Sequence, residues 1–89
     1  MNLIYSPNYK SARAFAMDHE FRPDDWKWLE DAGVLQHNPR ADVFKVEDWE
    51  DNPQREEIDE AMERFQKVHR LGTVVDVDAF QGKVGVYLR

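Results

Sequence analysis

A short polar stretch that follows the first apolar run could hold an anion. Leu3-Ile4-Tyr5 reads as a strand, and Ser6-Pro7-Asn8 then starts a helix. Free N–H groups in the first turn of a helix can bind a phosphate. The side chains that would surround it are Ser6, Asn8, Tyr9 and Lys10. The chain has neither G-x-G-x-x-G nor G-x-x-x-x-G-K-[ST], and Pro7 removes one donor, so ordinary helix capping competes with this small-ligand or nucleotide site.

A second group of residues could bind a protein. Trp49 lies inside the acidic stretch Glu47-Asp48-Trp49-Glu50-Asp51. Tryptophan is enriched at the energetic centres of protein interfaces, and a rim of carboxylates would steer a basic partner toward it. The predicted partner-binding residues are therefore Trp49, Glu47, Asp48, Glu50 and Asp51. The competing interpretation is that Trp49 folds back over the sheet edge and covers the core.

The remaining histidines and carboxylates form no pattern typical of catalysis or metal binding. Asp18-His19-Glu20, His37 and His69 lack the i, i+4 histidine pair of a zinc-binding helix. Asp76 and Asp78 share one face of a predicted strand without an identifiable catalytic neighbour. The chain has no cysteine, which excludes disulfides and thiolate metal sites. We therefore predict that the protein is not an enzyme and has no catalytic residue, metal site or cofactor.

Composition limits the classes to which the chain can belong. Its 89 residues predict one domain, 1–89, and 34% of them are charged. No apolar stretch reaches the length of about 18 residues expected of a membrane span, and the start lacks the features of a signal peptide. We therefore expect a cytoplasmic protein, as a monomer or weak dimer. The net charge of −6 disfavours direct binding to nucleic acid, whose phosphates need a basic face.

The negative charge is concentrated in one part of the chain. Residues 42–63 hold ten acidic side chains against Lys45 and Arg55. The segment includes the Trp49 loop and the start of a helix. It is either a solvated helix N-terminus with its loop or an acidic docking surface.

A strand–cap–helix pattern occurs twice and predicts the fold. The first copy is a strand over 2–5, Ser6-Pro7, and a helix over 8–20; the second is a strand over 41–46, Asn52-Pro53, and a helix reaching about Arg70. Serine and asparagine are good N-caps, and proline fits the first helical position. The second helix carries an apolar stripe at helical spacing, made of Ile58, Ala61, Met62, Phe65, Val68 and Leu71.

Further elements complete the predicted sheet. Trp26–Leu29 reads as a strand, and residues 30–41 read as a polar connector. Gly72 is the glycine expected to end the second helix, and residues 73–77 read as a fourth strand. Apolar alternation over 84–88 predicts an edge strand in a hairpin, with a frayed tail as the alternative. The predicted class is α/β: a small open, mostly parallel, half-Rossmann-like sheet of about four parallel strands with two helices and an antiparallel C-terminal edge hairpin.

The chain resembles a class of small uncharacterised actinobacteriophage proteins. The resemblance rests on Ile4-Tyr5-Ser6-Pro7-Asn8-Tyr9-Lys10-Ser11-Ala12, then Phe15-Ala16, then Arg22-Pro23-Asp24-Asp25-Trp26. The class shares a Tyr-x-x-Asn-Tyr start, an Ala-rich first helix, a Pro-x-x-Trp strand entry and a Pro-started second helix, and the pattern covers most of residues 2–78. The resemblance implies a phage-encoded, cytoplasmic α/β protein without an assigned reaction, and it carries over no catalytic residue.

Three functions remain open at this stage. The leading hypothesis is a non-enzymatic binding protein, made by a phage during infection, that engages a host protein through the acidic loop and helix start. The first alternative is a half-Rossmann module that binds a small ligand or nucleotide through Ser6–Lys10. The second is an acidic nucleic-acid mimic, whose carboxylates would have to be spaced along a surface like phosphates. A docking surface instead needs Trp49 exposed among the carboxylates.

Overall fold

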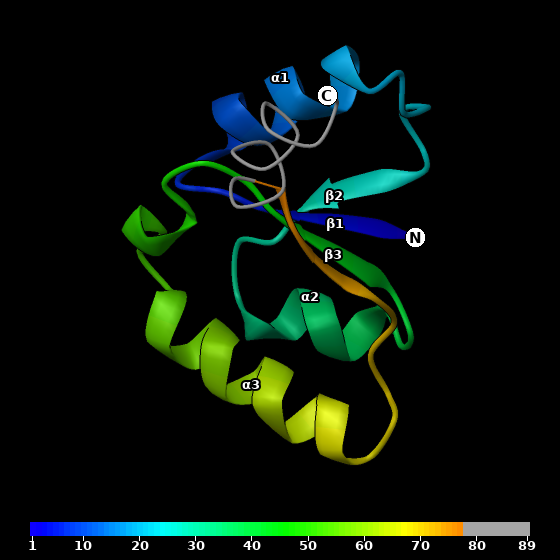
Figure 1. Cartoon of the computed structure of the whole chain (residues 1–89), viewed down its shortest axis with the longest axis vertical. Coiled ribbons are helices and arrows are strands. Elements are labelled where there is room, and N and C mark those ends of the chain that lie inside the picture. Colours follow the sequence, from blue (N-terminus) through cyan, green and yellow to red (C-terminus); the bar gives the residue numbers. More distant parts are fainter. Residues whose placement is uncertain (78–89) are drawn as a thin grey trace, which may run out of the picture.

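A parallel sheet organises the part of the chain that the structure describes. The computed structural model describes residues 1–77, and within them four strands lie in the order β2-β1-β3-β4. The strands are β1 (Asn2–Tyr5), β2 (Trp26–Trp28), β3 (Asp42–Lys45) and β4 (Val74–Asp76). All three pairings are parallel, and Figure 1 shows the strands side by side. The predicted small α/β fold with a parallel sheet is therefore confirmed.

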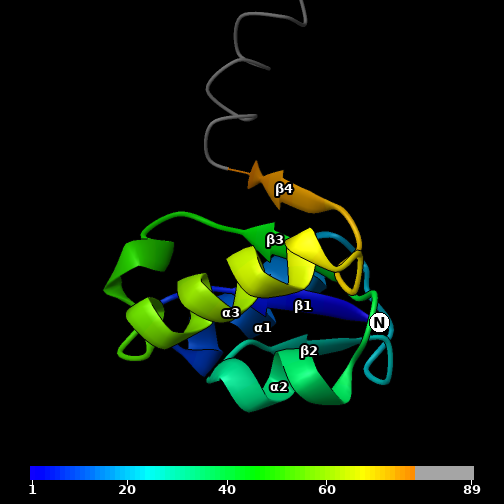
Figure 2. The same cartoon turned by 90° about the horizontal axis from the view of Figure 1, so that it is seen from below.

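Helices cover both faces of this sheet. Helix α1 (Tyr9–Asp18) lies on one face, and helices α2 (Ala32–His37) and α3 (Arg55–Lys67) lie on the other (Figures 1 and 2). Parallel neighbours cannot be joined by tight turns, so each helix serves as the crossover between two strands. The result is a three-layer arrangement in which the sheet is covered on both sides.

Side chains alternate along β1, so this strand contributes to a hydrophobic core on each face of the sheet. Leu3 and Tyr5 are fully buried under α2 and α3, whereas Ile4 is fully buried under α1. Ile58, Ala61 and Met62 of α3 are buried on the first side, as the apolar stripe predicts. Phe65 is only partly buried, and Val68 is 56% exposed. The stripe therefore packs over its first two turns and leaves the sheet toward the end of the helix.

The predicted polar connector over 30–41 contains a helix, so the prediction of two helices is wrong. Asp31 caps α2 by accepting a hydrogen bond from the Val34 N–H at 3.2 Å. Six residues are too few to show a helical period, and Gly33 lowers the helical propensity further. Leu35 nonetheless anchors α2, because its side chain is 1% exposed.

The predicted N-caps are each displaced along the chain. Asn8, not Ser6, caps α1, because its Oδ1 accepts a hydrogen bond from the Ser11 N–H at 2.9 Å. Pro7 therefore precedes the helix instead of opening it. In the second unit α3 begins at Arg55, and Asn52 lies outside it. Ser6 and Asn52 are instead the two buried polar residues among 1–77, and their side chains form buried hydrogen bonds that are described below.

Glycine does not end α3, contrary to prediction. His69 adopts the left-handed conformation (φ 58°), with its N–H donating to the Gln66 carbonyl and the Arg70 N–H donating to the Phe65 carbonyl. This is the Schellman arrangement that glycine usually provides. Gly72 is needed for a different reason: a Cβ there would lie 2.7 Å from the Arg40 carbonyl oxygen. The predicted C-terminal hairpin lies outside the described residues.

Replacing His69 with glycine should stabilise the protein. A left-handed residue with a Cβ costs roughly 1–2 kcal/mol, and the greater freedom of glycine in the unfolded chain offsets about half of this. We expect His69→Gly to raise the free energy of unfolding by about 0.5–1 kcal/mol in urea denaturation. Gln66→Gly is the matched control within the last helical turn and should lower it by up to about 1 kcal/mol. A loss of stability in both variants would contradict the prediction.

Candidate functional site

The carboxyl ends of β1 and β3 form the switch point of the sheet. From β1 the chain passes through α1 to β2 on one side, and from β3 it passes through α3 to β4 on the other. In open α/β sheets ligands bind in the crevice outside such a point. The two segments that meet here are 6–8, which follow β1, and 46–52, which follow β3. The Val46 N–H donates to the Tyr5 carbonyl at 3.0 Å and holds them together.

The side chain of Asn52 joins chain segments beside the switch point. Its Nδ2 donates to the carbonyl oxygens of Ser6 (2.9 Å) and Leu29 (3.0 Å), and its Oδ1 accepts from the Gln54 N–H (2.7 Å). The residue is 4% exposed. The Trp28 indole N–H also donates to the Ser6 carbonyl, at 3.2 Å. A buried, hydrogen-bonded amide therefore connects the segments that follow β1, β2 and β3 at this edge.

The groups predicted to bind an anion are engaged within their own loop. Ser6 is fully buried, and its Oγ donates to the Asn8 carbonyl at 2.7 Å. The Asn8 side chain caps α1, as described above. Tyr9 is 53% exposed and turns away to stack on Trp26, with ring centroids 5.8 Å apart. Lys10 is exposed on α1. This geometry lends no support to the nucleotide alternative.

Trp49 is half-buried, and its ring packs against the core. It opens the 3-10 turn η1 (Trp49–Asp51), which follows the left-handed residue Asp48 (φ 63°). Its ring centroid lies 5.1 Å from that of Tyr5, and the Lys45 ammonium lies 3.9 Å from it. These contacts favour the interpretation in which Trp49 covers the core. The neighbouring carboxylates of Glu47, Asp48, Glu50 and Asp51 are exposed.

The structure extends the acidic loop into a larger surface. Glu30 and Asp31, which follow β2, join the acids of the loop and of the first turn of α3. One hollow of about 560 Å³ is lined by Glu30, Asp31 and Glu57, among others, and a neighbouring hollow of about 410 Å³ by Glu50, Glu56 and Glu57, among others. We call this surface the acidic edge; it consists of Glu30, Asp31, Glu47, Asp48, Glu50, Asp51, Glu56 and Glu57. Glu30 and Asp31 were not predicted, although the shared edge of parallel strands was the signal that could have found them.

None of the carboxylates of the acidic edge forms a salt bridge within residues 1–77, although Arg55 lines the same hollow as Glu50, Glu56 and Glu57. Within residues 1–77 the one salt bridge joins Lys67 to Glu63 at 3.5 Å, and neither belongs to this surface. In the same part of the chain no three carboxylate or imidazole groups converge as metal ligands would. The His37 ring contacts the Gly33 carbonyl, and the His19 ring packs at a tilt against Phe15. The acidic edge is therefore a spread of separate charges.

A hydrogen bond between Tyr5 and Asp59 lies beneath the acidic edge. The Tyr5 side chain is fully buried, and its hydroxyl donates to Asp59 Oδ1 at 2.7 Å and lies 3.3 Å from the Arg55 carbonyl oxygen. Burial and, secondly, the hydrogen bond to the Asp59 carboxylate raise the pKa of Tyr5 far above its ordinary value. The pair fastens α3 to the end of β1. Sequence reasoning missed it because 54 positions separate the partners.

No family model, curated protein or solved structure matches this chain. In the part that the structure describes, no helix has the length and apolar character needed to cross a membrane.

Asn52→Asp should destabilise the protein strongly. The change replaces the Nδ2 donor with an oxygen, leaves the buried carbonyls of Ser6 and Leu29 without this partner, and places a charge in the crevice. We expect a loss of about 2–4 kcal/mol in chemical denaturation. Asn8→Asp is the matched control, because aspartate caps a helix as well as asparagine does, and it should change stability by less than about 0.5 kcal/mol. Similar losses in the two variants would contradict the assigned role.

The Tyr5–Asp59 pair should make stability fall at alkaline pH. Because the pKa of Tyr5 is raised in the folded state, its contribution is complete below the unfolded tyrosine pKa of about 10 and is lost as pH rises above that value. The wild-type free energy of unfolding should therefore decline between about pH 9 and 11 more steeply than that of Tyr5→Phe. Urea denaturation across this range measures the difference. Parallel pH profiles for the two proteins would show that Tyr5 ionises freely in the fold.

Proposed function

We propose that this protein is a non-enzymatic binding protein whose acidic edge docks a basic host protein. The observation that carries the proposal is the exposed set of carboxylates at one edge of the sheet, none of which forms a salt bridge within residues 1–77. Loops after β2 and β3 and the start of α3 contribute to it together. Since the set spans several elements, it presents one broad negative surface to a partner.

The charge of the acidic edge suits a protein partner. Surface carboxylates that are not neutralised create a field that steers a basic molecule and raises its association rate. Lys45, the nearest lysine of the loop, lies over the Trp49 ring instead of pairing with a carboxylate. Lys45 therefore does not pair with the carboxylates of the loop.

Trp49 has a narrower role in this proposal than an exposed anchor would have. Its contacts with Tyr5 and Lys45 fix the start of η1 and so hold Glu50 and Asp51 in place. The uncovered part of the indole can still contact a partner. Truncating Trp49 would disturb packing and binding at once, so variants of the carboxylates test the function more cleanly.

The resemblance to actinobacteriophage proteins favours a host protein as the partner. A phage-encoded protein of this kind acts in the host cytoplasm during infection. The nucleic-acid mimic is a special case of the same proposal, in which the basic partner is a DNA-binding protein. It is distinguished by competition with DNA.

A pull-down from actinobacterial lysate, read by mass spectrometry, tests the proposal. Glu50→Gln/Glu57→Gln neutralises two carboxylates of the acidic edge without changing side-chain size. We expect this variant to lose the captured protein and to lower the association rate of the purified partner roughly tenfold at low salt. The difference should shrink at high salt, because exposed charges are screened beyond about 8 Å at physiological ionic strength.

Asp24→Asn/Asp25→Asn is the matched control. It makes the same change in net charge on two exposed carboxylates of the turn that leads into β2, at the opposite edge. The control should retain the partner. Equal loss in both variants would reduce the effect to net charge and contradict docking at the acidic edge. Displacement of the partner by duplex DNA would identify it as a DNA-binding protein and the acidic edge as a mimic.

A further inference from the structure

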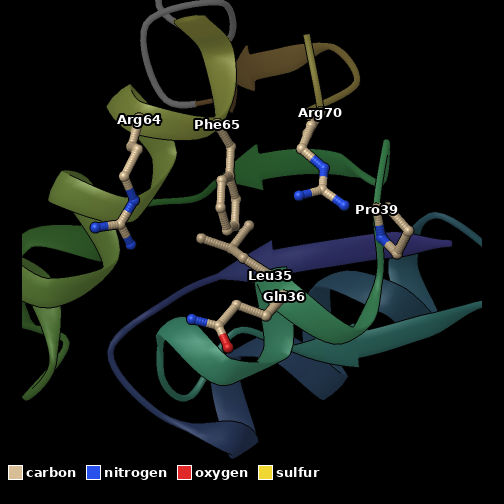
Figure 3. A pocket seen from close by; sticks show the side chains of 6 residues that line it. All are labelled: Leu35, Gln36, Pro39, Arg64, Phe65 and Arg70. Carbon is tan, nitrogen blue, oxygen red and sulfur yellow. The ribbon is translucent and has the colours of Figure 1, made fainter. Parts of the chain in front are cut away.

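The far end of α3 carries the opposite charge. Arg64 and Lys67 lie in its last turns, and Arg70 follows the helix. A hollow of about 410 Å³ opens there between α2 and α3. Its lining consists of Leu35, Gln36, Pro39, Arg64, Phe65 and Arg70 (Figure 3). We call this hollow the Arg–Phe groove.

The groove combines an apolar floor with two cationic sides. Figure 3 shows the Phe65 ring directed at Leu35, with the guanidinium groups of Arg64 and Arg70 on either side. The Arg64 Cζ lies 5.7 Å from the centre of the Phe65 ring. Within residues 1–77 neither guanidinium takes part in a salt bridge. Both are exposed, so their donors are available to a ligand.

Backbone hydrogen bonds hold Arg70 beside the groove. The Arg70 N–H donates to the Phe65 carbonyl at 2.9 Å, and the Arg70 carbonyl accepts from the Arg40 N–H at 2.8 Å. Arg70 is thereby fastened both to α3 and to the loop that follows α2. Buried Leu35 fixes the floor from the α2 side. A ligand would find this frame already formed, which lowers the entropic cost of binding.

We propose that the Arg–Phe groove binds an extended acidic peptide segment of a partner protein. In this segment an apolar side chain at position i would lie on the exposed part of the Phe65 ring, which buried Leu35 supports from beneath. Carboxylates at i−2 and i+2 would meet Arg64 and Arg70, because alternate side chains of an extended chain share one face. Guanidinium groups pair with carboxylates through two parallel hydrogen bonds, which gives both strength and direction.

The chemistry of the groove favours a peptide over other anions. A small free anion would engage one guanidinium and leave the apolar floor uncovered. A nucleic acid would bring many phosphates, whereas this groove offers two arginines. Only a ligand with separated carboxylates and an apolar group between them satisfies the floor and both sides.

A peptide with the order acid-x-Leu-x-acid, labelled with a fluorophore, provides the test. Fluorescence anisotropy measures its binding to the full chain. We expect Arg64→Ala and Arg70→Ala each to weaken binding about tenfold or more, because a charge-assisted hydrogen bond is lost. Lys67→Ala is the matched control: it removes an equal charge from the same helix, but Lys67 pairs with Glu63 and does not line the groove. It should change binding by less than about twofold.

Changes in the ligand separate this proposal from simpler ones. Replacing the leucine with serine, or both acids with glutamine, should each reduce binding to wild type. The proposal would be overturned if the peptide does not bind to the wild-type protein, or if inorganic phosphate at equal concentration displaces it. It would also be overturned if Lys67→Ala weakens binding as much as the arginine variants do. Circular dichroism confirms that each variant is folded. Glu50→Gln/Glu57→Gln should bind the peptide like wild type, so failure of the acidic edge and failure of the groove are distinguishable.

Discussion

The Asn52 side chain is the interaction on which the site depends. Backbone groups that leave a parallel sheet at its carboxyl edge must find partners, because buried carbonyls without hydrogen bonds are costly. One amide satisfies the carbonyls of Ser6 and Leu29, which follow neighbouring strands, and also receives the Gln54 N–H ahead of α3. Three segments distant in sequence are joined by one residue. The path of the chain from β3 into α3, and hence the position of the acidic edge, follows from that junction.

The direction of the helices explains why the charges separate. In a sheet of parallel strands the crossover helices run opposite to the strands, so helix N-termini gather at the carboxyl edge. Carboxylates are favourable near helix N-termini and cations near C-termini. Helix α3 has Glu56 and Glu57 in its first turn and Arg64 and Lys67 toward its end. Local helix electrostatics and the parallel topology thus place an acidic edge at one end of α3 and the Arg–Phe groove at the other.

Long, periodic elements were predictable from the sequence, and single polar contacts were not. The 13-residue helix α3 and the apolar strands have patterns long enough to be read, which is why the parallel α/β class was predicted correctly. Helix α2 is too short for such a pattern. Ser6 and Asn8 are both good caps, and only the burial of Ser6 decides between them. The pairing of Tyr5 with Asp59 depends on how α3 lies on the sheet, which no local pattern contains.

Buried contacts stabilise the backbone beneath the acidic edge against repulsion between its charges. Eight like charges on one edge repel one another, and such repulsion destabilises a compact fold. Three contacts stabilise this region: the Tyr5–Asp59 hydrogen bond, the packing of Trp49 on Tyr5, and the hydrogen bonds of Asn52. These contacts are buried or half-buried and need no neutralising ion pair at the surface. The carboxylates can therefore remain unpaired while their backbone stays in place. A basic partner would reduce the electrostatic repulsion between these carboxylates. This reduction would contribute to the free energy of binding.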